Sequence, residues 1–227
     1  MTFFEEIWEL LSSAKYMEMI YTGLGTTVLV SFFAAILGLV LGTLVALVAI
    51  APNSAVMKLP KLLCKVYVTV IRGTPMALQL FIMMYAIFAI RGFPQEITAI
   101  LAFGINSGAY VSESIRGGIL SVDIGQTEAG RALGLSGKTT MMKIVIPQAI
   151  KNIIPTLGNE YISLVKETSI VSFATATDIF KSFREIGDAT YEYVIPYFFM
   201  AVVYIVIVLI LTLIVKAVEA RLRRSEK

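Results

Sequence analysis

Five long apolar stretches constrain the fold of this 227-residue chain more than any other feature of its sequence. A helix needs about 20 mostly apolar residues to cross the hydrocarbon core of a bilayer. The stretches that reach or approach this length are 24–50, 66–90, 97–117, 147–166 and 194–215. The fourth is the weakest, because Pro155 interrupts it. The sequence therefore predicts an all-α membrane protein with five transmembrane helices.

The composition agrees with a chain whose main solvent is lipid. Hydrophobic residues make up 57% of the chain and charged residues 15%, whereas soluble domains carry about 25% charged residues. The segments between the apolar stretches are too short for a separate soluble domain, so we expect a single transmembrane domain over residues 1–227. Its first segment, 1–19, is predicted to be an interfacial amphipathic helix, since its apolar residues can share one face.

Histidine and cysteine, which often serve in catalysis and metal binding, are absent or rare in this chain. The chain has no histidine, and Cys64 is its single cysteine. This excludes histidine-dependent catalysis, histidine metal sites and cysteine clusters. The net charge of +3 is too small to indicate a nucleic-acid partner. We expect no metal in this chain. The expectations that it has no catalytic residue and no cofactor, and that it is not an enzyme, follow from the resemblance described below.

The placement of lysine and arginine predicts the orientation in the membrane. The segments 51–65 and 118–146 and the C-terminal tail are basic, whereas the N-terminus and the segment 167–193 are rich in acidic residues. Basic segments favour the cytoplasm, so we expect a cytoplasmic C-terminus. Five spans then place the N-terminus outside.

The segment 125–147 predicts a compact helix–glycine–helix elbow. Thr127 can cap a short helix that runs to about Leu133, and Gly134 is a favourable helix stop. Ser136 can cap a second helix that runs to Ile146. An elbow over residues 127–146 in a cytoplasmic loop would offer a docking surface to another protein.

One motif in this elbow is misleading. Gly137-Lys138-Thr139 is similar to the end of a phosphate-binding loop. That loop also needs a glycine where Ala132 stands, together with a preceding strand, which the sequence lacks. We therefore do not expect this chain to bind nucleotide.

The elbow closely resembles the EAA signature of ABC-importer permeases. The matching residues, all at the spacing of the signature, are Glu128-Ala129-Gly130, Gly134, Ile144 and Ile146-Pro147. Gly130 and Ile146 depart from it, since the signature has Ala and Leu there. Further stretches resemble the polar amino acid uptake family, namely Arg72-Gly73-Thr74-Pro75, Glu113 with Arg116-Gly117-Gly118, Gly125-Gln126, and Lys166-Glu167-Thr168-Ser169.

The resemblance implies the fold of a type I ABC-importer permease, with the elbow as its cytoplasmic coupling helix. It also implies an assembly in a prokaryotic plasma membrane that contains two ATPase subunits, a second permease copy or paralogue, and an extracytoplasmic substrate-binding protein. ATP and Mg²⁺ would bind to the ATPase subunits, and membrane lipid would surround the permeases. The residues expected to couple to the ATPase are Thr127, Glu128, Ala129, Arg131, Gly134 and Lys138. Glu128 could instead stabilise only the start of its own helix.

Polar side chains form two stripes at helical spacing within the apolar stretches. The longer stripe comprises Gln148, Asn152, Thr156, Asn159, Glu160, Ser163 and Glu167, and the shorter one comprises Asn106, Tyr110, Glu113 and Gly117. Such faces must turn towards protein or water within a membrane. They could line a translocation path, or they could hold packed helices together by hydrogen bonds. The predicted substrate-binding residues are Glu160, Asn159, Thr156, Ser163, Glu113, Tyr110, Asn106 and Arg72.

Glu160 leads to the substrate prediction. It lies near the middle of its stretch, and the nearest cation in the same stretch, Lys166, is six residues away. A carboxylate at the bilayer centre is costly and calls for a partner or a function, so we expect the import of polar, preferentially basic, amino acids. Glu113 is better explained by an ion pair with Arg116 or Arg72. The alternative function is an ion-coupled secondary carrier, which would predict inverted repeats that we do not find.

Overall fold

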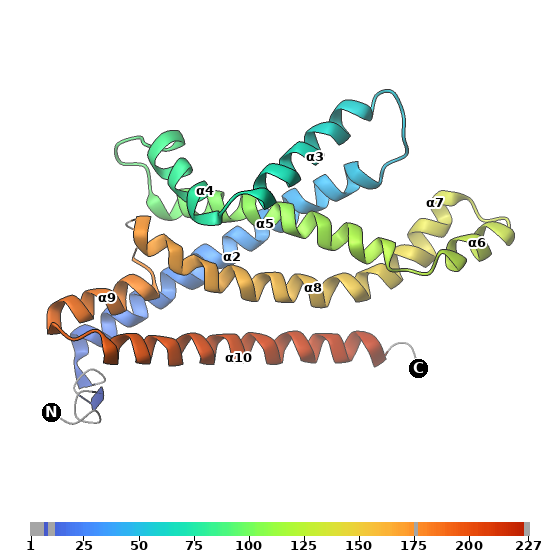
Figure 1. Cartoon of the computed structure of the whole chain (residues 1–227). Helices are drawn as coiled ribbons and strands as arrows, with labels where there is room; N and C mark the ends of the chain where they lie inside the picture. The colour runs from blue at the N-terminus through green and yellow to red at the C-terminus, as the bar shows by residue number, and fades with distance from the viewer. Residues whose placement is uncertain (1–6, 9–11, 175–176, 225–227) are drawn as a thin grey trace. The chain divides into compact units, whose positions relative to one another are not determined.

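The computed structural model describes residues 7–8, 12–174 and 177–224, and these ranges contain helices and no strand (Figure 1). The longer helices are α2 (Ala14–Ile50), α3 (Lys58–Gly73), α5 (Gln95–Leu120), α8 (Ile146–Glu167), α9 (Ile179–Thr190) and α10 (Val194–Arg224). The shorter ones are α4 (Met76–Ile82), η1 (Met83–Ile87), α6 (Ile124–Ala132), α7 (Gly137–Thr140), η2 (Met141–Val145) and η3 (Thr168–Ala174). The all-α prediction is confirmed for these residues.

Within the described ranges, two helices are long and apolar enough to span a membrane by themselves. They are α2 and α10, and a third span results if the broken pair of α3 and the helical stretch Met76–Ile87 is taken as one. The predicted stretches 97–117 and 147–166 are also helical, within α5 and α8, but they carry the polar stripes. The number of five spans therefore stays a prediction. Residues 1–6 and 9–11 of the predicted interfacial helix 1–19 lie outside the described residues, and its last part, 14–19, belongs to α2.

The second predicted span is not one continuous helix, which corrects the expectation for 66–90. The chain breaks after Gly73, and α4 begins at Met76 behind Pro75. Proline has no N–H to donate and restricts the residue before it, so it is tolerated at a helix start and not in a helix interior. The Gln79 side chain donates to the Thr74 hydroxyl over 2.8 Å and so ties α4 to this break.

Pro155 behaves differently from the expectation that it interrupts its helix. α8 continues on both sides of Pro155. Pro155 has no N–H for the Lys151 carbonyl one turn earlier. The Thr156 hydroxyl donates to the adjacent Asn152 carbonyl over 3.1 Å. The polar stripe is therefore carried by one helix.

The described chain forms two compact units. Unit 1 comprises residues 1–37, 74–104 and 162–210, and unit 2 comprises residues 38–73, 105–161 and 211–227. In unit 1, α9 packs its apolar face, Ile179, Phe183 and Ile186, against Ile20 of α2. Asp178 caps α9 by accepting the backbone N–H of Lys181.

Unit 2 is held together by close approach of small residues. A Cβ atom on Gly38 would meet the Ser107 hydroxyl at 2.6 Å, and one on Gly42 would meet Val111 at 2.6 Å. This Gly-x-x-x-Gly spacing lets α2 lie directly against α5, as small residues do in membrane helices. The hydroxyl of Tyr67 on α3 donates to the Ile105 carbonyl of α5 over 2.5 Å. Together these contacts fix α2, α3 and α5 around the site described next.

Candidate functional site

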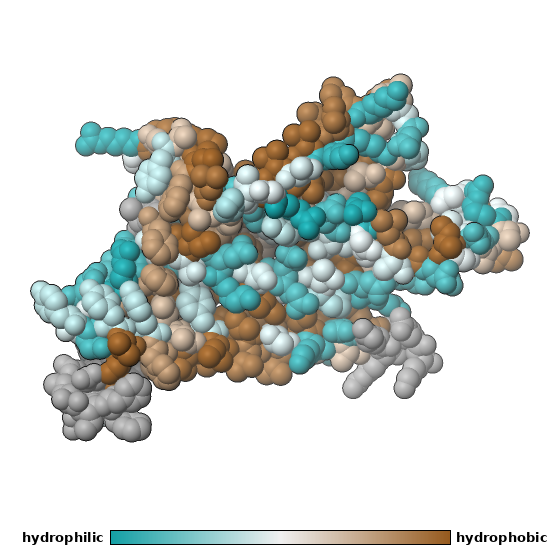
Figure 2. Space-filling model, viewed as in Figure 1, coloured by the Kyte–Doolittle hydropathy of each residue, from teal (hydrophilic) through white to brown (hydrophobic). Residues whose placement is uncertain are grey.

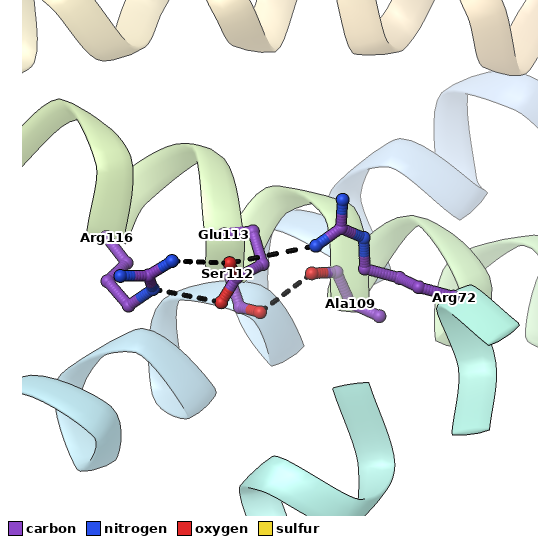
Figure 3. A network of polar contacts seen from close by, with 5 residues as sticks. All are labelled: Arg72, Ala109, Ser112, Glu113 and Arg116. Carbon is purple, nitrogen blue, oxygen red and sulfur yellow. Dashed lines mark hydrogen bonds and ion pairs between the residues drawn. The ribbon is translucent and has the colours of Figure 1, made fainter. Parts of the chain in front are cut away.

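Three charged side chains from α3 and α5 form an ion-pair cluster in unit 2 (Figure 3). Arg116 donates two hydrogen bonds to the Glu113 carboxylate, over 3.0 Å from Nε and 2.7 Å from Nη2. Arg72 approaches the same carboxylate from α3, with 3.7 Å between Nη1 and Oε2. The cluster is only partly buried, since 29% of the Glu113 side chain is exposed. The Arg116 fork gives this pair a fixed geometry, which a single-point contact would lack.

The local sequence explains this cluster. Glu113 and Arg116 are three residues apart, which places both on the same face of α5. Tyr110 lies one turn earlier, and the Arg72 guanidinium stands over its ring at 5.2 Å from the centroid. Arg72 is thus held by a carboxylate and an aromatic face. The preferred reading of Glu113, an ion pair, is confirmed.

A cavity of about 440 Å³ opens beside the cluster. It is lined by the last turns of α2, by α3 and by α5, and its charged residues are Lys61, Lys65, Arg72, Glu113 and Arg116. Arg72 and Glu113 are the predicted substrate-binding residues that line it. The other six do not, namely Asn159, Thr156, Ser163, Glu160, Tyr110 and Asn106. The cavity therefore has a different chemical character from the stripe on α8.

Some residues of the stripe on α8 donate hydrogen bonds to neighbouring segments, and others do not. Near its start, the Asn152 amide donates to the Ser121 hydroxyl over 2.9 Å, and the Gln148 amide donates to the Gln126 side chain over 3.3 Å. These two residues connect α8 to the end of α5 and to α6. The open alternative, hydrogen bonding between helices, therefore holds for this part of the stripe.

The middle of the stripe offers free polar surface. Thr156 and Asn159 are exposed, and Glu160 is half-buried and interacts electrostatically with Arg72. Figure 2 shows hydrophilic surface along α5 and α8. Of the remaining predicted residues, Asn106 is buried within unit 2, and Ser163 lies on the part of α8 that belongs to unit 1. The structure thus brings together Arg72, Tyr110, Glu113 and Glu160.

The elbow forms as a helix pair, but its first cap differs from the prediction. α6 begins at Ile124 and is capped by Asp123, whose carboxylate accepts the N–H of Gly125 over 2.8 Å. Thr127 lies inside this helix, so its predicted role as the cap is wrong. The sequence signal for the correct cap was Asp123 itself, because aspartate is as good an N-cap residue as threonine or better.

The end of α6 has the hydrogen-bond pattern of a Schellman motif. Leu135 N–H donates to the Gly130 carbonyl over 3.1 Å, and Gly134 N–H donates to the Arg131 carbonyl over 3.0 Å. Gly134 has a φ of +80°, which favours glycine because a Cβ atom is strained there. Ser136 then caps α7 by accepting the N–H of Thr139 over 3.1 Å. The predicted helix stop and the second cap are both confirmed. The second helix does not end at Ile146 as predicted, because α7, η2 and α8 follow one another without a gap.

The elbow presents a largely exposed surface. Glu128, Ala129, Arg131 and Lys138 are exposed, and 81% of Leu133 at the turn is exposed. Gly130 is the buried residue of the signature. It contacts α7, so that a Cβ atom there would meet the Thr140 side chain at 2.7 Å. The two helices thus pack closely against each other, and charged and apolar side chains are exposed on their outer surface.

Known proteins are similar in sequence to nearly the whole chain. Residues 38–224 match the family described as the binding-protein-dependent transport system inner membrane component. The chain is 39% identical to the arginine transport system permease protein ArtQ of Bacillus subtilis, over 91% of this chain and 94% of that protein. It is 38% identical to a putative glutamine transport system permease protein GlnP of Rickettsia felis, over 89% and 92%.

A solved structure has a similar fold. It is described as an amino acid ABC transporter with histidines, and it matches with a TM-score of 0.85 and 38% sequence identity. The match covers 93% of this chain and 98% of that one.

Proposed function

This chain belongs to the family of binding-protein-dependent transport system inner membrane components, and from this membership we propose that it imports polar, preferentially basic, amino acids. It is an ABC-transporter permease for amino acids, as its relatives are. Their substrates differ, since one relative is named for arginine and another for glutamine. The preference for basic amino acids rests on one observation, the half-buried Glu160 on the polar face of α8.

The chemistry around Glu160 supports this preference. Its carboxylate has no hydrogen-bond or ion-pair partner within the described chain, although it interacts electrostatically with Arg72. A basic side chain of the substrate would supply the missing partner, and the neighbouring Asn159 and Thr156 could donate to or accept from the substrate backbone. Arg72 and Glu113 already form an ion pair with each other, so they are better suited to line the translocation path than to bind the substrate.

We propose that α6 and α7 couple transport to a separate ATPase subunit. Their exposed Glu128, Arg131 and Leu133 would enter a depression on the ATPase, and the bonds of Gln148 and Asn152 would carry its movement into α8. The full transporter would contain two permeases, two ATPases that bind ATP and Mg²⁺, and an extracytoplasmic binding protein. It would lie in the bacterial inner membrane, with the C-terminus in the cytoplasm.

The substrate proposal is tested by Glu160→Gln in proteoliposomes that contain the complete transporter. Because loss of one partner of a desolvated charge pair weakens binding strongly, we expect arginine and lysine uptake to fall at least about tenfold. Glutamine uptake should change much less, since glutamine has no side-chain cation. Glu18→Gln, which replaces an exposed glutamate on α2, is the matched control. Unchanged arginine uptake by Glu160→Gln would refute the proposed preference.

The energy source separates the proposed importer from the alternative carrier. Uptake should require ATP inside the vesicles and should be lost when the ATPase subunits cannot hydrolyse it. An ion gradient imposed without ATP should drive no uptake. Gradient-driven uptake by the permease alone would instead establish the secondary carrier.

A further inference from the structure

The cavity beside the ion-pair cluster has an excess of positive charge. Its four cationic side chains and one carboxylate leave a formal charge of +3. That carboxylate, Glu113, already pairs with Arg116 at 2.7 Å and with Arg72 at 3.7 Å. A site for a zwitterionic amino acid would keep a negative group available for the ammonium. The charge balance of this cavity favours an anion instead.

Lys65 is the cation that has its charge fully available. Lys61 donates to the Ala51 carbonyl over 2.5 Å and to the Asn53 side chain over 2.8 Å, so it is tied to the loop between α2 and α3. Lys65 is exposed and makes no ion pair or hydrogen bond with any residue in the described ranges. A bound anion would therefore find one unengaged ammonium and three further charges nearby.

The position of the cavity along the helices agrees with the depth of lipid headgroups. Val45 and Ala49 line it from the last turns of α2, which is one of the two clear candidate spans. Lys61 and Lys65 line it from the first half of α3, and Arg116 lies one turn before the end of α5. The ends of spanning helices lie near the interface between hydrocarbon and headgroups, where basic side chains are favourable.

Apolar side chains are exposed next to this basic cavity. On α3 they are Leu62, Leu63 and Val66, and on α2 they are Leu44 and Leu47. α3 is therefore amphipathic, with lysines three and four residues apart on one face and exposed aliphatic residues on the other. A free anion would use only the charges, whereas a lipid would use the charges and the apolar surface together.

We propose that this cavity binds the phosphate headgroup of an anionic membrane lipid. Lys65 contacts the phosphate, Lys61 and Arg116 add to the local potential, and the acyl chains lie along the exposed aliphatic residues of α3. Basic pockets between membrane helices bind anionic headgroups by this combination of charge and apolar contact. No residue of the stripe on α8 lines the cavity, although Arg72 and Glu113, which were also predicted to bind substrate, do.

The single cysteine of the chain provides a built-in probe, because Cys64 lines the same cavity. The complete transporter is placed in vesicles of phosphatidylcholine alone, or of phosphatidylcholine with phosphatidylglycerol. A membrane-permeant maleimide is added, and the alkylation of the Cys64 peptide is followed by mass spectrometry. An occupied site should slow alkylation in phosphatidylglycerol by about fivefold, as mass action predicts for a mostly filled site.

Two lysines on the same helix supply the variant and its control. Lys65→Gln should remove the protection, whereas Lys58→Gln, which removes an exposed lysine outside the cavity, should keep it. Equal protection in both variants would overturn the proposal, because it would reflect only the charge of the bulk surface. If the Lys65→Gln transporter does not assemble, Lys65→Arg is used in its place. Native mass spectrometry then measures the phosphatidylglycerol that the unaltered transporter retains. No retention above phosphatidylcholine would then overturn the proposal.

Two other occupants give different results. Inorganic phosphate added to phosphatidylcholine vesicles should leave the alkylation rate unchanged, and protection by it would assign the cavity to a soluble anion instead. If a second permease covers the cavity, Cys64 should be protected to the same extent in both lipid mixtures, which also overturns the proposal. Loss of arginine uptake in Glu160→Gln is independent of all these outcomes, so the two proposals can fail separately.

Discussion

At the scale of single residues, identical residue types have different roles because their surroundings differ. Glu113 and Glu160 both lie within helices predicted to span the membrane. Glu113 pairs with two arginines, whereas Glu160 interacts electrostatically with one of them, Arg72. The spacing of Glu113 and Arg116 along α5 made their pairing predictable. The approach of Arg72 was not predictable in the same way, because it depends on how α3 packs against α5.

Asp178 carries a buried carboxyl group and lies outside the helices that are long enough to span a membrane. From its burial we predict that the stability of the protein depends on pH. Asp178 is 1% exposed, and its Oδ2 atom has no hydrogen-bond partner in the described ranges. Burial raises its pKa from 3.8 to about 6, although the N–H donors of α9 and the charge of Lys181 oppose the rise. The Tyr204 hydroxyl, which interacts electrostatically with Asp178, is also buried and without a hydrogen-bond partner in the described ranges.

The direction of this pH dependence follows from the raised pKa. Below pH 3.8 the carboxyl is protonated in both folded and unfolded chains, and above about pH 6 the folded chain must bury a charge. Stability should therefore fall as the pH rises from about 4 to 6, by about 3 kcal/mol in the limit. Asp178→Asn keeps a good N-cap and should remove this dependence and raise the melting temperature at pH 7.5.

Thermal unfolding of the solubilised protein at several pH values checks this prediction. Asp123→Asn, which replaces the exposed cap of α6, is the control and should leave the pH dependence as it is. If Asp178→Asn has the same pH profile as the unaltered protein, the buried carboxyl is not its source.

At the scale of elements, the turn between α6 and α7 depends on the backbone conformation of Gly134. Its φ of +80° strains any residue with a Cβ atom, at a cost of about 1–2 kcal/mol. We expect Gly134→Ala to uncouple transport, so that ATP hydrolysis by the assembled transporter responds less to substrate. Gly137→Ala is the matched control, since its added Cβ would find its nearest neighbour, Arg131, at 3.7 Å. Equal effects of the two substitutions would argue against the strained turn.

The contact between α6 and α7 explains one departure from the EAA signature. The signature has alanine at the position of Gly130, but a Cβ atom there would meet Thr140 Cγ2 at 2.7 Å. We expect Gly130→Ala to lower the thermal stability of the protein, with a free-energy loss of about 1–3 kcal/mol for overpacking. Thr140→Ser removes the obstructing methyl group and should recover part of the loss in the double variant. A double variant no better than Gly130→Ala would place the cause elsewhere.

The elements of this chain were more predictable than their ends and interruptions. Apolar length and helical spacing were enough for α2, α5, α8 and α10, because a bilayer requires long helices whose backbone groups are all paired. The break at Pro75 and the continuity at Pro155 were not distinguished, since the effect of proline depends on which neighbours satisfy the freed carbonyl. The cap of α6, by contrast, was readable from the sequence, because aspartate is at least as good an N-cap residue as threonine.

The residues of the candidate site could be predicted from the sequence, but which of them lie close together in space could be predicted less well. Arg72, Tyr110, Glu113 and Glu160 were all expected and lie in the same unit. The basic cavity was not expected, because it combines Lys61 and Lys65 of a presumed surface loop with residues of two other helices. The spacing of residues along one helix can be read from a sequence. A cavity between three helices cannot, because it depends on how those helices pack against one another.

At the scale of the whole molecule, the distribution of lysine and arginine makes a prediction about orientation. Two exposed alanines test it, Ala132 at the end of α6 and Ala189 near the end of α9. Each is replaced by cysteine in a Cys64→Ser background, and intact cells are treated with a membrane-impermeant maleimide. Ala189→Cys should react from outside, whereas Ala132→Cys should react only after the membrane is opened, because the basic loop around α6 favours the cytoplasm.

The same experiment bears on the elbow as a coupling device. ATP is supplied in the cytoplasm, so a helix pair that docks on an ATPase must be on that side of the membrane. Assembly with the ATPase should also slow the labelling of Ala132→Cys in opened membranes and leave that of Ala189→Cys unchanged, because only the former lies on the proposed docking surface. Labelling of Ala132→Cys in intact cells would reverse the orientation, and α6 and α7 could then not connect this permease to ATP hydrolysis.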